Sequence, residues 1–203
     1  MVFLRLIVPL SIFHFPLAGG LASTFLDGID WSVNLFNLPN LHINYVLLDK
    51  ILDIYYLSIE AYVLLKWKSI MAKNMAIGLF IWRAMGVILF AVIGKEFLFF
   101  WFPNIFENFF LFYVAVAFFL KKEPKLSALT LWISFIILAI PKLVQEYVMH
   151  VQLVSNWRAV TIAGLPFKYD NLYHQLFIGI ALVAVVTFIQ LKKYKAPQHK
   201  KTK

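Results

Sequence analysis

Residues 75–94, MAIGLFIWRAMGVILFAVIG, form an apolar stretch with one charged side chain, Arg83. A helix needs about twenty such residues to cross the hydrocarbon core of a bilayer. Similar apolar runs fill most of the 203-residue chain on both sides of this stretch. The sequence therefore predicts an all-α, polytopic membrane protein.

The composition excludes several classes of protein. Apolar residues make up 62% of the chain and charged residues only 14%, where a soluble domain has about a quarter charged. Mean hydropathy is +0.80. These values exclude a soluble enzyme, a disordered chain and a nucleic-acid-binding domain. Cysteine is absent, which excludes disulfides, thiol redox chemistry and cysteine-ligated metals.

Six apolar runs are long enough to be transmembrane helices. They cover residues 3–22, 43–65, 75–94, 103–120, 126–150 and 171–191. A cleaved signal peptide is the alternative for the first run, because Arg5 precedes an apolar stretch there. We expect one domain over residues 1–191, a bundle of six transmembrane helices, followed by a basic cytoplasmic tail over residues 192–203.

The distribution of basic residues predicts the orientation. With both termini in the cytoplasm, the inner side holds thirteen Lys and Arg residues, Arg5 among them, and the outer loops hold three. This is the positive-inside bias of cell-membrane proteins. The expected localisation is therefore the cell membrane, multi-pass, with both termini cytoplasmic. The six tail lysines are expected to attract anionic lipid in the bilayer, and no nucleic-acid partner is expected.

Residues 24–42, between the first two spans, have an amphipathic pattern. Leu26, Ile29 and Val33 recur at helical spacing, while Asp27 and Asp30 fall on the other side. The segment contains no Lys or Arg. It is predicted to form a short helix lying in the outer membrane interface.

Eight ionisable side chains fall inside the predicted spans. The acids are Asp49, Asp53, Glu60, Glu107 and Glu146, and the bases are Lys50, Arg83 and Lys142. An Asp, Lys or Arg at such a position costs about 2.5 to 3.5 kcal/mol on insertion scales. Each therefore needs a partner or a function, and complete pairing still leaves two carboxylates over.

Polar residues recur on one face of each of three spans. The three stripes are Asp49, Asp53, Tyr56 and Glu60; Asn104, Glu107 and Asn108; and Lys142, Glu146 and His150. We expect the stripes to face one interior and to line a hydrated, outward-opening acidic cavity. The five acids would bind a cation or a cationic substrate group, with the three bases as counter-charges. Arg83 is expected to bond Asp53, Glu60 or Glu107. The alternative is a set of ion pairs that only hold the bundle together.

A metal site is a further hypothesis. His150 and Glu146 stand four residues apart and would need a third ligand from another span, such as His174. No HExxH motif or repeated histidine box is present.

The favoured function is transport or the handling of ions or protons. One alternative is a membrane-embedded enzyme acting at the outer leaflet, with Asp49 and Asp53, or Glu146 and His150, as acid-base or metal-binding groups. Another is a structural subunit of a larger membrane complex. The expected protein partners are further copies of the chain or other membrane subunits.

Overall fold

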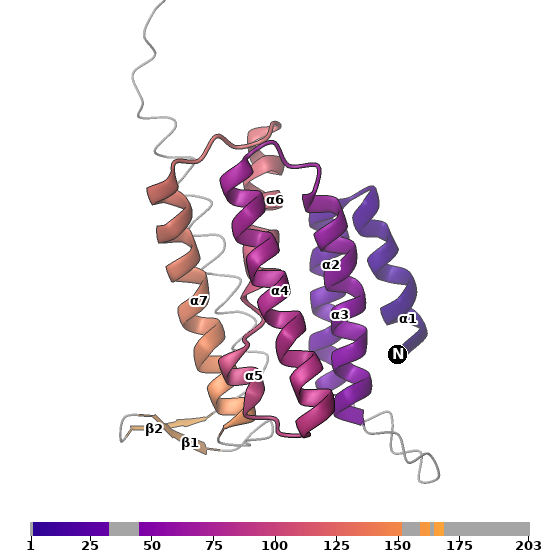
Figure 1. Ribbon diagram of the computed structural model, residues 1–203, viewed down its shortest axis with the longest axis vertical. Coiled ribbons are helices and arrows are strands. Elements are labelled where there is room, and N and C mark those ends of the chain that lie inside the picture. Colours follow the sequence, from indigo (N-terminus) through magenta and orange to yellow (C-terminus); the bar gives the residue numbers. More distant parts are fainter. Residues whose placement is uncertain (1, 33–44, 152–158, 163–164, 169–203) are drawn as a thin grey trace, which may run out of the picture.

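The computed structural model describes residues 2–32, 45–151, 159–162 and 165–168. These residues form seven α-helices, one 3₁₀ helix and one antiparallel pair of strands (Figure 1). The elements are α1 (Val2–Ile7), η1 (Val8–Phe13), α2 (Pro16–Ser32), α3 (Tyr45–Leu64), α4 (Ile70–Ile93), α5 (Leu98–Trp101), α6 (Ile105–Leu120), α7 (Ala128–His150), β1 (Ala159–Ile162) and β2 (Leu165–Lys168). The predicted helical class is confirmed, whereas the strand pair was not predicted. The predicted sixth span and the tail lie outside the described residues.

The long helices lie side by side and are connected at alternate ends of the bundle (Figure 1). One end carries the α3–α4 and α6–α7 connections and is called the lysine end, after Lys66, Lys68, Lys121, Lys122 and Lys125. At the opposite end α3 begins, and α4 and α7 finish. It is called the acidic end, after the carboxylates described below.

Two of the described helices, α4 and α7, are long and apolar enough to cross a membrane. They have 24 and 23 residues. The 20-residue helix α3 contains four charged side chains, and α6 has only 16 residues. By length and composition, the membrane-crossing character is therefore carried by α4 and α7.

The prediction of a single helix over residues 3–22 is wrong. The chain forms α1 and η1, turns at His14 and Phe15, and returns as α2 in the opposite direction (Figure 1). Phe15 precedes Pro16, which disfavours a helical backbone at that position and has no N–H to extend the helix. Gly19 allows the two arms to approach closely, because a Cβ at this position would lie 2.6 Å from the backbone nitrogen of Ile12.

The prediction of a separate interfacial helix starting at residue 24 is also wrong, because residues 24–32 continue α2. The hydroxyls of Ser23 and Thr24 donate to the carbonyls of Gly19 and Gly20, at 2.8 and 3.0 Å. Both hydroxyl groups thus donate their hydrogen bonds within α2 and do not cap the start of a new helix. Residues 33–44 lie outside the described residues.

The bounds of α4 show how local signals place a helix. It begins five residues earlier than predicted, because the side chain of Ser69 accepts a hydrogen bond from the Ala72 N–H and caps it. It ends before Gly94, whose φ of 70° lies in the left-handed region that closes many helices. Helices α3, α6 and α7 begin and end within two residues of their predicted bounds.

Aromatic side chains fill the bundle toward the lysine end. Phe106, Phe109 and Phe110 of α6 are fully buried. The ring of Trp67 stacks on that of Tyr113, with centroids 3.8 Å apart. The interior toward the lysine end is therefore mainly aromatic, and most buried charged side chains lie toward the acidic end.

The outer faces of α4 and α7 are apolar. Val92 is 81% exposed, Leu129 is 68% exposed and Ile88 is 65% exposed. By contrast, Arg83 and Glu146, on the same two helices, are buried. A soluble protein has the opposite arrangement, with few large apolar side chains grouped on its surface and charged ones outside.

Candidate functional site

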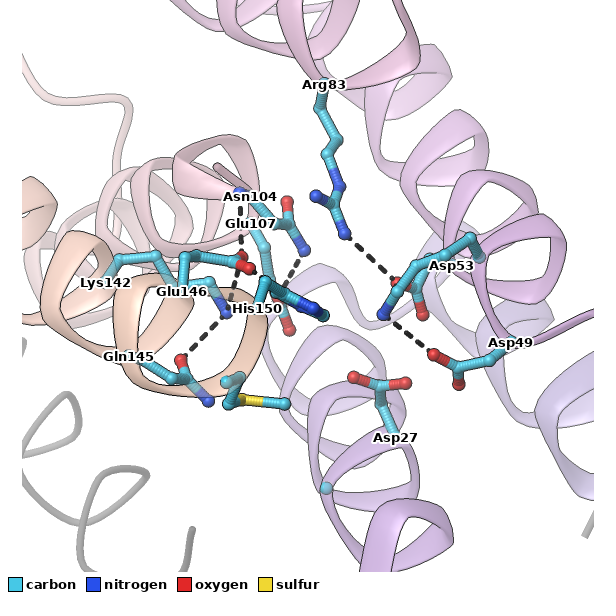
Figure 2. Close-up of a pocket in the computed structure, with 13 residues that line it drawn as sticks. Asp27, Asp49, Asp53, Arg83, Asn104, Glu107, Lys142, Gln145, Glu146 and His150 are labelled. Atoms are coloured by element: carbon cyan, nitrogen blue, oxygen red, sulfur yellow. Dashed lines mark hydrogen bonds and ion pairs between the residues drawn. The ribbon is translucent and has the colours of Figure 1, made fainter. Parts of the chain in front are cut away.

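A cavity of about 40 Å³ lies between the long helices toward the acidic end (Figure 2). Its charged and titratable lining residues are Asp27, Asp49, Lys50, Asp53, Arg83, Glu107, Lys142, Glu146 and His150. The volume is enough for roughly three water molecules. The three polar stripes expected from the sequence therefore meet around one cavity, and α2 adds Asp27 to them.

Three aspartates form one side of the cavity, and Arg5 lies among them. One guanidinium nitrogen of Arg5 donates to Asp49 Oδ1 at 2.6 Å. The other donates to Asp27 Oδ1 at 2.5 Å and to Asp53 Oδ1 at 2.8 Å. Arg5 is only 3% exposed. Its charge-assisted hydrogen bonds to Asp49 and Asp53 are buried, and the one to Asp27 is partly buried.

The prediction that Arg5 lies on the same side as the loop lysines is wrong. It bonds to Asp49, in the first turns of α3, whereas Lys66 follows the other end of that helix. Helix α1 packs alongside α3, and the turn at His14 and Phe15 then returns the chain as α2, which brings Asp27 to the same end. The Arg5–Asp27 pair was missed because the two residues were assigned to different membrane regions. Pro16, just after that turn, was the signal that could have revealed it.

Lys50 and Arg83 approach the same aspartates. Lys50 Nζ lies 2.8 Å from Asp49 Oδ2 and 3.2 Å from Asp53 Oδ2. Arg83 Nη2 lies 3.5 Å from Asp53 Oδ2, and its Nη1 donates to the Phe102 carbonyl at 3.0 Å. The prediction that Arg83 pairs with an acid of another helix is confirmed. The positive charges of Arg5, Lys50 and Arg83 thus balance the negative charges of the three aspartates.

Side chains of α7 line the other side of the cavity. Lys142 Nζ lies 3.8 Å from Glu146 Oε1 and donates to Gln145 Oε1 at 3.0 Å. His150 Nε2 lies 3.3 Å from Glu146 Oε2, and its Nδ1 lies 3.6 Å from Glu96 Oε2. The nearby imidazole of His150 holds the pKa of Glu96, in the α4–α5 connection, below its usual value.

Glu60 and Glu107 have fewer partners than the other acids. Glu60 does not line the cavity, is 0% exposed, and has no hydrogen-bond partner at either carboxylate oxygen. Glu107 lines the cavity, and its Oε2 accepts from Asn104 Nδ2 at 2.8 Å. Its Oε1 is buried without a partner. Four of the five predicted acids therefore meet at the cavity, and Glu60 lies away from it.

The aspartates also have the spacing of a metal site. Asp27, Asp49 and Asp53 each offer an oxygen, and these oxygens lie within 4.8 Å of one another. Carboxylate oxygens suit hard cations such as Ca²⁺ or Mg²⁺. A metal ion here would compete with the Arg5 guanidinium. The predicted site at His150 stays a prediction, because its partner His174 lies outside the described residues.

Comparison of the chain with models of protein families, with curated proteins and with solved structures found no match. Inference about function therefore rests on the cavity, its charges and the surface of the bundle.

Proposed function

We propose that this chain is a multi-pass membrane protein that takes up a cation or protons through the cavity at its acidic end. The observation that carries the proposal is a small polar cavity whose lining includes five carboxylates from four helices. Such side chains are costly inside a bilayer and mark ion and proton pathways there. A volume of about 40 Å³ suits an ion or a few water molecules better than a large solute.

The surface supports the membrane part of the proposal. Large apolar side chains point outward on α4 and α7, while charges are buried inside. The proposed spans are α2, α3, α4, α6, α7 and the apolar run at residues 171–191. In this arrangement α2 replaces residues 3–22 as the first span, and α1 and η1 fold back beside it.

The lysine end faces the cytoplasm in this proposal. Without Arg5, its loops, the first turn of α4 and the tail still hold twelve Lys and Arg residues, against three in the opposite loops. The C-terminal tail is therefore cytoplasmic. Helix α1 begins near the acidic end, where Arg5 bonds Asp49. The N-terminus is therefore proposed on the outer side, which revises the expectation of a cytoplasmic N-terminus.

Flux measurements in liposomes test the function. The purified protein is reconstituted, and an imposed gradient of pH, Na⁺ or K⁺ is followed with fluorescent indicators. Asp53→Asn is expected to lower the flux roughly tenfold or more, because it removes a carboxylate in contact with three buried bases. Asp49→Asn provides a second variant should Asp53→Asn fail to fold.

The control is Glu123→Gln, which removes a carboxylate at the lysine end, away from the cavity. It is expected to keep the flux of the unmodified protein. A flux no greater than that of empty liposomes, or one that both cavity variants preserve, would contradict the proposal.

A further inference from the structure

The ion pairs of the interior leave two carboxyl groups without a cation. The pairs join Arg5, Lys50 and Arg83 to Asp27, Asp49 and Asp53, and Lys142 to Glu146. Among the described residues, the buried acids that remain are Glu60 and Glu107. The sequence alone predicted a surplus of two carboxylates, and the pairings now identify them.

Glu60 lies in an environment that does not suit a charge. Its Oε1 is 3.3 Å from the place where a Cβ on Gly20 of α2 would stand, and the side chains of Leu111 and Phe110 of α6 border the same place. Both oxygens are buried and have no hydrogen-bond donor. Burying an isolated carboxylate in this way is strongly unfavourable. A bound proton removes that cost.

Glu107 connects Glu60 to the cavity. Glu107 stands one turn before Leu111 on α6, and the side chain of Leu111 borders the same place beside Gly20 as Glu60 Oε1. Glu107 also lines the cavity, and its Oε1 is buried without a partner. Tyr56 stands one turn from Glu60 on α3 and has a buried hydroxyl without a partner. Buried polar groups without hydrogen-bond partners thus extend from the cavity toward Glu60.

We propose that Glu60 and Glu107 form a proton-binding pair that is loaded from the cavity. A hydronium ion in the cavity gives its proton to Glu107 and leaves as water. The proton then passes from Glu107 to Glu60. Burial without a hydrogen-bond partner disfavours the ionised form of Glu60, so the pair keeps at least one proton.

The surroundings favour a proton over a metal cation at Glu60. A hard cation needs about six oxygen ligands, and the Glu60 carboxyl is bordered by a glycine backbone and apolar side chains. The charged or titratable groups that line the cavity together with Glu107 are Asp27 of α2, Asp49, Lys50 and Asp53 of α3, Arg83 of α4, and Lys142, Glu146 and His150 of α7. The inference rests on the proposed function, since it names the proton as the ion handled.

Infrared spectroscopy of the purified protein in detergent tests the pair directly. The unmodified protein is expected to show, at neutral pH, the carbonyl band of a protonated carboxyl group, and this band should shift in D₂O. Glu60→Gln and Glu107→Gln should each remove or shift it. The control Glu123→Gln should leave it unchanged. Gel filtration reports whether each variant is folded, and either glutamate variant suffices if the other fails to fold.

The infrared and flux measurements separate the two proposals. A missing band in the unmodified protein, or a band that both glutamate variants leave unchanged, overturns the proton-binding pair even when flux depends on Asp53. A band that responds to both variants, in a protein without flux, supports the pair and overturns the proposed function. Proton flux that Glu60→Gln abolishes, together with loss of the band, supports both.

Discussion

Carboxyl groups on one helix of this protein have contrasting surroundings. Asp53 of α3 has oxygens within 3.5 Å of nitrogens of Arg5, Lys50 and Arg83. Glu60, two turns further along, has no partner at either oxygen. Opposite charges favour the ionised form of a carboxyl group, and burial without partners favours the neutral form. Asp53 is therefore suited to be a fixed charge and Glu60 to carry a proton.

Glu123 holds the two connections of the lysine end together. Its Oε1 accepts hydrogen bonds from the backbone N–H groups of Lys68 and Ser69 and from the hydroxyl of Tyr113. Partial burial favours the neutral form of Glu123, but these donors outweigh it and hold the pKa below its usual value of 4.5. The ionised form is thus the one that stabilises the folded state.

Glu123→Gln is expected to lower the free energy of unfolding by roughly 1 kcal/mol, because the amide accepts these hydrogen bonds less strongly than the carboxylate. The contribution of Glu123 is present in full above about pH 4.5 and declines as the pH falls through its lower, folded-state pKa. Thermal unfolding in detergent at pH 7 and at acid pH measures both effects. The difference between variant and unmodified protein should shrink at acid pH; a difference that grows would contradict this assignment.

At the scale of elements, α4 has two glycines with contrasting surroundings. A Cβ added at Gly86 would lie 2.2 Å from Cβ of Phe102, in the segment between α5 and α6. A Cβ at Gly78 would meet no atom within 4 Å. Gly86 therefore allows the segment that leads into α6 to approach α4, close to where Arg83 bonds the Phe102 carbonyl.

Gly86→Ala is expected to destabilise the protein by about 1 to 3 kcal/mol, because the backbone of one element must move to make room. Gly78→Ala is the matched control on the same helix. It should be neutral or stabilising by up to about 1 kcal/mol, the helix-propensity gain of alanine over glycine. Melting temperatures in detergent compare the two variants, and equal values would show that the close approach at Gly86 does not limit stability.

For the whole molecule, the polarity is inverted relative to that of a soluble protein. Charged side chains from five helices and from α1 meet inside, and large apolar side chains cover the outer faces of α4 and α7. The hydrocarbon core of a bilayer favours this arrangement, because lipid tails can contact the apolar outer faces directly. The arrangement also concentrates fixed charge in one small cavity.

The proposed orientation is testable because the chain has no cysteine of its own. Lys95 lies in the α4–α5 connection and Lys122 in the α6–α7 connection, and both are exposed. A cysteine replacing Lys95 should react with a membrane-impermeant thiol reagent added outside intact cells. One replacing Lys122 should react only after the cells are opened. Reversed labelling would contradict the orientation, and equal labelling from outside would contradict a membrane lying between the two ends.

Sequence pattern was sufficient for the helical class, for the bounds of α3, α6 and α7, and for the charged residues that line the cavity from those three helices. These are local properties: apolar runs set the helices, Ser69 and Gly94 delimit α4, and helical periodicity places Asp49 and Asp53 on one face. Tertiary structure alone decided that Arg5 and Asp27 join the site and that the surplus acids are Glu60 and Glu107. Those facts depend on the turn at residues 14–15 and on distances between helices, because a charge pairs with whatever the packing brings near it and not with its neighbours in the chain.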